Sequence, residues 1–368
     1  MDDSCSPAAT AVAPGFLAEL ERLRTWFDAE LARFLTARRA EIAAEAPDAV
    51  ELADEVARLV GSGGKRLRPA LVVAGWRACG GRDLAVVSPL AQAAELLHTY
   101  LLIHDDIMDH AELRRGAPTV HAELRERHRA AGFPGDSAEH GRALAILAGD
   151  LAASWAAELA YRAADPPGVA RTWALMASEV IAGQYLEMRL PLLARGGGRP
   201  SEAELLNVLR LKSGRYSVER PIELGARLAG ADAATLTALA TYGRAVGEAF
   251  QLQDDLLGLF GEAQETGKSV GGDFLEGKYT LLLHFALERA AEADRTWLLA
   301  RLGQADLPAD ELHQALARIR ATGARERLEG EIEARFAAAL AALDDAALQP
   351  EGHDFFTGLV AYLRERDR

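Results

Sequence analysis

The chain has few cysteines, few aromatic residues and no excess of positive charge. Its two cysteines, Cys5 and Cys79, stand far apart without metal-site spacing, which excludes a disulfide framework or zinc site and fits a reducing cytoplasm. A net charge of −14 argues against nucleic acid as a partner, because a phosphate backbone needs a basic surface. No uninterrupted apolar run reaches the roughly 18 residues of a transmembrane helix, and the N-terminus lacks a basic signal region. We expect a cytoplasmic protein without a transmembrane segment.

Valine and isoleucine are also scarce, whereas alanine and leucine dominate, and this balance favours helices over strands. Apolar residues recur at helical spacing from Phe16 onward, and no convincing alternating strand appears. Glycine and proline breaks are too short to act as interdomain linkers. The sequence predicts an all-α fold in which residues 1–14 are a disordered lead-in and residues 15–368 form one large helical bundle.

Two carboxylate clusters lie inside otherwise apolar stretches. The first contains Asp105, Asp106 and Asp109, and the second contains Asp254 and Asp255. On a helix, Asp105 and Asp109 project from nearly the same face, where their charges repel unless cations lie between them. Magnesium prefers oxygen ligands and typically bridges a few carboxylates to the phosphates of a substrate. The clusters therefore predict a magnesium-dependent clamp for a diphosphate.

Two basic segments point to further anion sites. Lys65, Arg66 and Arg68 follow a glycine pair, an arrangement that suits either phosphate binding or an ordinary solvated helix start. Arg114 and Arg115 come just after the first aspartates, where arginine forks would engage phosphate oxygens. The second basic segment favours the phosphate interpretation, so two anion sites are predicted.

Taken together, these motifs resemble the trans-isoprenyl diphosphate synthases, also called polyprenyl synthetases. Further matching segments are Gly149-Asp150, Gly183-Gln184, Lys212-Ser213, Phe250 to Asp255, and Gly267-Lys268 to Lys278. They span over half of the chain in the family's order. A single aspartate motif would be weak evidence, because it also occurs by chance on exposed helices.

The resemblance implies an all-α isoprenoid-synthase fold around a metal and diphosphate cavity, and a role for most of the polar motif residues. It implies that Mg²⁺ and an allylic diphosphate bind at Asp105, Asp106, Asp109, Asp254 and, as a supporting residue, Asp255. It implies cations for the allylic diphosphate at Arg114, Lys212, Lys268 and Lys278. Isopentenyl diphosphate would meet Lys65, Arg66 or Arg68, His98 and Arg115. Gln184 and Phe250 complete the substrate-binding set, and Lys212, Ser213 and Gln251 would supply catalytic dipoles. Relatives are usually homodimers, so a homodimer is expected.

The chain departs from the family pattern at three positions. Gly258 stands where many relatives carry the last aspartate of the second cluster, Glu187 replaces a shorter aspartate, and Ser213 replaces a commoner threonine. Because Asp254 is the position expected to contact metal most directly, activity should survive the missing carboxylate at Gly258.

Other functions compete with the synthase. His98 on an apolar helix could be an ordinary core histidine, and His104-Asp105 could be the metal doublet of an HD-type phosphohydrolase. A class I terpene cyclase shares the first aspartate motif but usually lacks the second aspartate pair and the glycine-lysine-arginine site. A noncatalytic subunit of a heteromeric synthase would keep the fold without the intact charged residues. Two diphosphate sites favour the coupling enzyme.

The length of the product is expected to depend on residues just before Asp105. A growing chain would enter an apolar tunnel whose floor Tyr100 and Leu101 would form. One aromatic at this position resembles short-chain synthases, and we expect geranylgeranyl diphosphate (C20), with farnesyl diphosphate (C15) as the alternative. The glycine-rich stretch from Gly261 to Lys278 is predicted to be a lid over the diphosphate.

Overall fold

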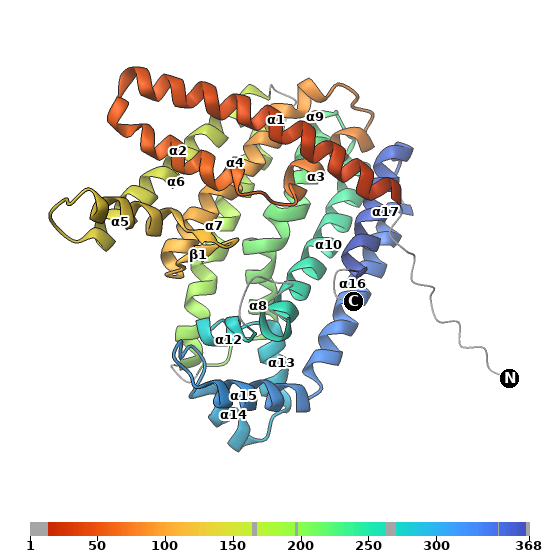
Figure 1. Ribbon diagram of the computed structural model, residues 1–368. Coiled ribbons are helices and arrows are strands. Elements are labelled where there is room, and N and C mark those ends of the chain that lie inside the picture. Colours follow the sequence, from red (N-terminus) through yellow and green to blue (C-terminus); the bar gives the residue numbers. More distant parts are fainter. Residues whose placement is uncertain (1–13, 164–167, 196–197, 262–269, 345, 366–368) are drawn as a thin grey trace.

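The computed structural model describes residues 14–163, 168–195, 198–261, 270–344 and 346–365, which form a bundle of helices (Figure 1). The first half of the chain supplies α1 (Pro14–Glu45), η1 (Pro47–Ala49), α2 (Val50–Gly61), α3 (Leu67–Ala78), α4 (Leu84–Met108), α5 (Val120–Ala130), α6 (Ser137–Arg162) and α7 (Val169–Arg195). The second half supplies α8 (Glu202–Leu209), η2 (Arg210–Glu219), α9 (Arg220–Leu228), α10 (Ala233–Phe260), α12 (Gly272–Glu276), α13 (Leu281–Arg289), α14 (Glu292–Leu299), α15 (Ala309–Ala321), α16 (Ala324–Asp344) and α17 (Pro350–Glu365). The all-α prediction is confirmed. Of the predicted lead-in at residues 1–14, residues 1–13 lie outside the described residues, and Pro14 is the first residue of α1.

One short hairpin interrupts the helices of the described chain. Strands β1 (Leu113–Arg114) and β2 (Ala117–Pro118) pair antiparallel, with Leu113 opposite Pro118. The two residues between the strands, Arg115 and Gly116, have φ angles of 54° and 77°, the positive values that a tight hairpin turn requires. This turn fixes Arg115 just beyond the end of α4.

Several helices begin at side chains that satisfy their free backbone N–H groups. Asp83 accepts a hydrogen bond from the Ala85 amide at 2.9 Å at the start of α4, and Asp232 accepts one from the Thr235 amide at 2.8 Å at the start of α10. Ser201 and Glu204 form a reciprocal capping box at the start of α8. These caps set where the long site-bearing helices begin.

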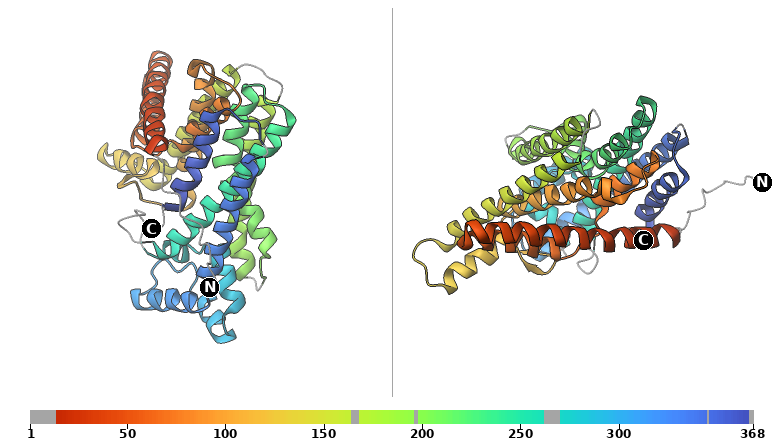
Figure 2. Two further views of the ribbon diagram at one scale, coloured as in Figure 1. Left: turned by 90° about the vertical axis from the view of Figure 1, so that its right-hand side faces the viewer. Right: turned by 90° about the horizontal axis from the view of Figure 1, so that it is seen from above.

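The long helices α4, α7 and α10 run down the middle of the molecule and converge toward its lower end, while α14 and α15 lie at the bottom (Figure 1). Helix α1 covers an outer face of the bundle, as the second view in Figure 2 shows. Fully buried Tyr242 ties α10 to α17, because its hydroxyl donates to the Phe356 carbonyl at 2.7 Å. This bond fixes α10, which carries the second aspartate cluster, against the C-terminal helix.

Two helices are long and apolar enough to cross a membrane by length and composition alone. These helices are α4 and α6. The buried share of the most apolar window is 67% in α4 and 39% in α6. Buried core helices pass the same test, so the finding is weak evidence for a membrane span. The thiol of Cys79 is half-buried at the end of α3, where burial and the negative charge of Asp232 raise its pKa to about 11 and keep it protonated.

Candidate active site

The two aspartate clusters occupy the lower ends of α4 and α10 and share charged neighbours. Burial, together with the negative charges of Asp109 and Glu187, raises the pKa of Asp105 to about 6. The pKa of Asp109 is also raised, first by burial and then by Glu276 and Glu187. Each of these crowded carboxylates makes ionisation of its neighbours less favourable. A bound cation would offset this repulsion.

Two lysines face the carboxylates from η2 and from the segment after α12. Lys212 donates a hydrogen bond to Glu187, and the Lys278 ammonium lies 2.7 Å from Glu276. Burial opposes the charged form of Lys212, but Glu187 and Asp105 outweigh it and raise the lysine's pKa. Both lysines therefore stay charged and balance the aspartates.

A first cavity opens beside these lysines, between α7, α8, α10 and the start of α13. Its polar lining includes Lys212, Ser213, Gln251, Asp255 and Lys278. The Gln251 amide donates to Asp255 at 2.9 Å, and burial raises the pKa of Asp255 well above its usual range. Leucines and Val208 also line the cavity. The cavity thus combines charged and apolar side chains.

Asp106 differs from its neighbours in the first cluster. Its side chain is buried, and Arg114 binds both of its oxygens, with Nε 2.9 Å from each and Nη2 2.6 Å from Oδ1. This bidentate pair fixes Arg114 beside Asp105 and Asp109. Asp106 anchors the arginine in this state, whereas Asp105 and Asp109 lie on the more open side of α4.

A second cavity of about 170 Å³ gathers the basic residues of the glycine-rich segment. Its lining includes Lys65, Arg68, His98, Arg115 and Phe250. Burial and the surrounding arginines lower the pKa of His98 well below its usual range, so its ring is neutral at physiological pH. The cavity presents cations and one neutral hydrogen-bonding ring, the surroundings that an anion requires.

Arg66 also borders this cavity, but its guanidinium is committed to the interior. Its Nη1 donates to Glu95 at 2.6 Å, its Nε donates to Asp28 at 2.8 Å, and its Nη2 donates to the Val60 carbonyl at 2.6 Å. Its backbone has a left-handed φ of 49°, which turns the side chain away from the path followed by Arg68. Arg66 holds α1, α2 and α4 together behind the cavity.

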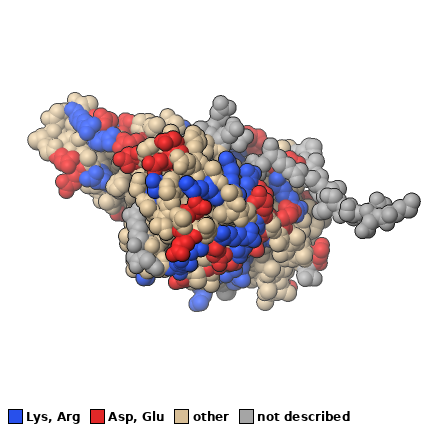
Figure 3. Space-filling model, turned by 90° about the horizontal axis from the view of Figure 1, so that it is seen from below, with Lys and Arg blue, Asp and Glu red and all other residues tan. Residues whose placement is uncertain are grey.

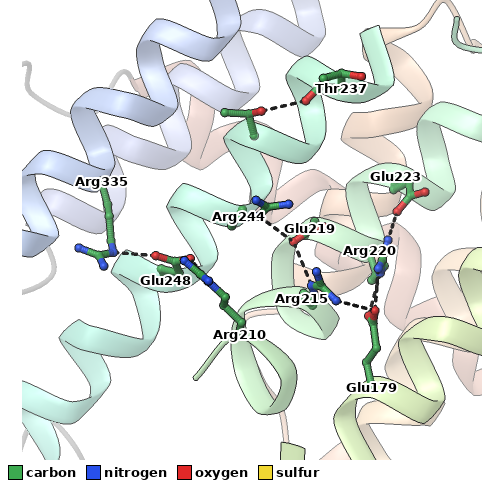
Figure 4. A network of polar contacts seen from close by, with 11 residues as sticks. Glu179, Arg210, Arg215, Glu219, Arg220, Glu223, Thr237, Arg244, Glu248 and Arg335 are labelled. Atoms are coloured by element: carbon green, nitrogen blue, oxygen red, sulfur yellow. Dashed lines mark hydrogen bonds and ion pairs between the residues drawn. The ribbon is translucent and has the colours of Figure 1, made fainter. Parts of the chain in front are cut away.

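The π-helix η2 connects the two cavities, because Lys212 and Ser213 line the first and Ser217 lines the second. Behind it, Glu179 of α7 accepts from Arg215 at 2.7 Å and from Arg220 at 2.8 Å (Figure 4). Helices of this kind are rare and often mark functional sites. The ion-pair network fixes an uncommon backbone that serves both cavities.

Comparison with known proteins agrees with this arrangement. Residues 50–319 match the family model for polyprenyl synthetase. A short chain isoprenyl diphosphate synthase of Methanothermobacter thermautotrophicus is 34% identical over 313 residues, which cover 80% of this chain and 88% of the relative. The chain belongs to the polyprenyl synthetase family. It is therefore a prenyl-transferring enzyme.

Further relatives of this polyprenyl synthetase differ in the product that they are named for. A geranylgeranyl diphosphate synthase of Mycobacterium tuberculosis is 32% identical over 79% of this chain and 78% of the relative. The structure of a Corynebacterium glutamicum geranylgeranyl pyrophosphate synthase, complexed with isoprenyl diphosphate and magnesium, matches with a TM-score of 0.86 and 36% identity, covering 94% of this chain and 99% of that one. A geranylfarnesyl diphosphate synthase of Aeropyrum pernix is 35% identical over 64% of this chain and 70% of the relative.

In this polyprenyl synthetase the remaining predicted site residues have distinct surroundings. Gln184 of α7 approaches Met108 at the end of α4, and its amide oxygen is buried without a hydrogen-bond partner in the described structure. Tyr100 is half-buried, with its ring 4.7 Å from that of His104, whereas Leu101 is packed into the core. Lys268 lies outside the described residues, as does the part of the predicted lid at residues 262–269.

Tyr216 is a site residue that the sequence did not reveal. Its hydroxyl lies 2.7 Å from Arg68 Nη2 and 3.3 Å from His98 Nδ1, and the Arg68 guanidinium stacks 4.5 Å from its ring. The tyrosine thus orients two of the predicted anion-binding side chains. In the sequence, only its position shortly after Lys212 could have indicated a role in the site. That spacing brings Tyr216 to the anion-binding residues only because the segment is the π-helix η2.

Proposed function

We propose that this polyprenyl synthetase joins isopentenyl diphosphate head to tail to an allylic diphosphate and releases geranylgeranyl diphosphate. The observation that carries the proposal is the pair of cavities linked by η2. One is lined by carboxylates and lysines, and the other by Lys65, Arg68 and Arg115. A coupling enzyme needs two diphosphate sites, whereas a cyclase needs one.

The allylic diphosphate would bind with Mg²⁺ at Asp105, Asp109 and Asp254. Mg²⁺ ions would take one or two carboxylates from each cluster and complete their shells with water and phosphate. The unpaired amide oxygen of Gln184 would accept a hydrogen bond from such a bound water. When bound, magnesium would neutralise charge on the departing diphosphate.

The protein's own residues would stabilise the two halves of a breaking C–O bond. Lys212 and Lys278 hold positive charge where the diphosphate gains negative charge. The Ser213 hydroxyl and the Gln251 amide border the same cavity and would place their dipoles beside the carbocation. The alkene of isopentenyl diphosphate would attack this cation, and the proton then lost would pass to the departed diphosphate, so no strong side-chain base is needed.

Isopentenyl diphosphate would occupy the second cavity. Lys65, Arg68 and Arg115 would neutralise its diphosphate, and the neutral His98 ring would supply a hydrogen bond. Phe250 of α10 borders the cavity as well and would shield the hydrocarbon end. Arg66 would support this site from behind, through Glu95 and Asp28.

The decisive experiment is incubation of the purified protein with isopentenyl diphosphate, Mg²⁺ and, separately, dimethylallyl, geranyl or farnesyl diphosphate. Products are dephosphorylated and sized by mass. A C20 alcohol is expected, while a C15 or longer alcohol would keep the chemistry and change the product. Hydrocarbon release without extension would favour a cyclase. No reaction with any primer would favour a noncatalytic subunit.

Tyr100 is proposed to limit the product length from its place beside His104. We expect Tyr100→Ala to lengthen the main product by at least one C5 unit, because removing the ring extends the space below the first aspartates. Product masses from matched reactions test this. Tyr161→Ala is the control, since that tyrosine is 77% exposed on α6 and should leave the product unchanged. An unchanged product from Tyr100→Ala would remove Tyr100 from this role.

We propose that the protein is a cytoplasmic homodimer. Ile181, Tyr185, Met188 and Leu192 form an exposed apolar stripe at helical spacing on α7. On the lower face of the molecule, acidic and basic side chains are interspersed (Figure 3). A second copy would bury the stripe.

Light scattering after size exclusion should give twice the chain mass for the wild type. The double variant Ile181→Asp/Met188→Asp is expected to shift the protein to the monomer, because two buried carboxylates would oppose association. Phe133→Asp, at an exposed loop tip, is the control and should remain dimeric. A dimeric double variant would place the interface elsewhere.

A further inference from the structure

A third cavity, of about 450 Å³, opens between α1, the start of α4 and the end of α6. It shares no lining residue with either cavity of the active site. On α4, Gln92 of this cavity precedes Asp105 by 13 residues, so about 20 Å of helix separates the two. Small-molecule sites have volumes of about 300 to 1,000 Å³. The third cavity is therefore large enough for a ligand and lies apart from the site of prenyl transfer.

The walls of the third cavity carry flat apolar surfaces. Trp26 and Phe34 line it from α1, Pro89 lines it from α4, and Leu159 lines it from α6. Both aromatic side chains are half-buried, so each keeps part of its surface accessible. The Arg38 guanidinium lies 5.4 Å from the centre of the Phe34 ring. Because aromatic rings pair favourably with one another, these walls suit a planar aromatic ligand.

Helix α4 presents hydrogen-bond acceptors to the cavity. Gln92 is 6% exposed, and its Nε2 donates to Ser88 at 3.0 Å, whereas its Oε1 is buried without a hydrogen-bond partner among the described residues. Pro89 lies inside α4 and has no N–H, so the Ala85 carbonyl loses its usual partner one turn later. Gln92 and Ala85 both line the cavity. An unpaired buried acceptor is unfavourable, so a ligand that donates an N–H or O–H would be stabilised here.

Helix α1 presents a donor to the same cavity. Arg38 Nη1 lies 3.3 Å from Glu158 and its Nη2 lies 2.7 Å from Glu41, and these ion pairs hold the guanidinium in place. Its Nε is buried and has no hydrogen-bond partner in the part of the chain that the structure describes. Three of the lining side chains are arginines and one is a glutamate. A charged N–H forms its strongest hydrogen bonds with an ionised acid, so an anionic oxygen suits this position.

We propose that the third cavity binds a flat aromatic acid that also carries a hydroxyl or amino group. The acid's oxygen accepts from Arg38 Nε, the ring packs against Trp26 and Phe34, and the hydroxyl or amino group donates to Gln92 Oε1. Such a ligand is neither a substrate nor a product of prenyl transfer, because isopentenyl and allylic diphosphates have no aromatic ring. The enzyme thus has a ligand site of a second kind.

The test is calorimetric titration of the purified protein with 6-hydroxy-2-naphthoate and 2-naphthoate, two probes that differ only in the hydroxyl donor. The wild type is expected to bind the hydroxylated probe about fivefold more tightly, because only its hydroxyl satisfies Gln92 Oε1. Gln92→Met keeps a side chain of similar shape without the amide, and it should bind the two probes equally. Circular dichroism and thermal unfolding check that each variant is folded.

A second variant tests the acid end of the ligand. Arg38→Met keeps an unbranched side chain and removes the Nε donor, so it should weaken the binding of both probes by about tenfold. Arg24→Met is the matched control, because Arg24 is exposed on α1 and lines none of the three cavities. Its affinity for both probes should equal that of the wild type.

A competition experiment separates the third cavity from the active site. The titration is repeated with saturating Mg²⁺, isopentenyl diphosphate and geranyl S-thiolodiphosphate, an allylic analogue whose C–S bond resists ionisation. Both probes should bind as before. Displacement of the probes would place them in the active site and overturn the proposal, as would absence of binding for both naphthoates.

The variants decide the individual contacts. A preference for the hydroxylated probe that persists in Gln92→Met would remove Gln92 from the site. Losses of equal size in Arg38→Met and Arg24→Met would show a general charge effect in place of a contact with Arg38, and would also overturn the proposal.

Discussion

Asp254→Ala is expected to abolish measurable chain elongation, with kcat lower by at least two to three orders of magnitude, on the order expected when a group stabilising transition-state charge is removed. Asp254 is half-buried at the lower end of α10, next to Asp255. In the proposed mechanism it holds the metal that neutralises the departing diphosphate. The measurement is kcat with isopentenyl and geranyl diphosphates at saturating Mg²⁺.

Asp310→Ala is the control for this prediction. Asp310 is an exposed residue in the first turn of α15, outside both cavities, and its loss should leave kcat unchanged. If Asp254→Ala kept kcat within a few-fold of the wild type, the ligand assignment on α10 would be wrong. The metal would then depend on Asp105 and Asp109 alone.

Gly183→Ala should have the next largest effect, although residue 183 carries no functional group. A Cβ at this position of α7 would lie 2.3 Å from the backbone nitrogen of Lys212 and 2.6 Å from its Cα, so η2 would have to move. A displacement of about 1 Å in a charged catalytic group can lower the rate by about a hundredfold. We expect kcat to fall by that order, measured in the same elongation assay.

Gly330→Ala is the matched control for the backbone argument. Gly330 lies within α16, and a Cβ there would meet nothing within 4 Å. Alanine should stabilise this helix by about 0.5 to 1 kcal/mol and leave kcat unchanged. A Gly183→Ala enzyme with normal kcat would show that η2 can shift without disturbing Lys212.

The sequence predicted the all-α fold, and it also indicated several residues that the structure places close together, because both depend on local signals. Helical spacing indicated that Asp105 and Asp109 share a face, and the structure places them together beside Lys212 and Glu187. The glycine-rich segment predicted an anion site, and Lys65 and Arg68 do line a common cavity. Motif order and periodicity were sufficient at these positions.

Other features depend on contacts between distant segments and could not be predicted. Arg66 and Arg68 look equivalent in the sequence, yet a left-handed backbone directs Arg66 toward Glu95. The bond from Arg114 to Asp106 separates Asp106 from the two neighbouring aspartates. In each case tertiary packing decides the role of a side chain whose type was known.

The π-helical backbone of η2 has a consequence for how this chain can vary over evolution. A π-helix is equivalent to an α-helix with extra residues accommodated in its turns. Deleting one residue soon after Lys212 would rotate the rest of the segment by about 100° around the helix axis. Tyr216 and Ser217 would then swing away from Arg68, to which both are bonded. The number of residues in this segment is therefore constrained as well as the identities of Lys212, Ser213 and Tyr216.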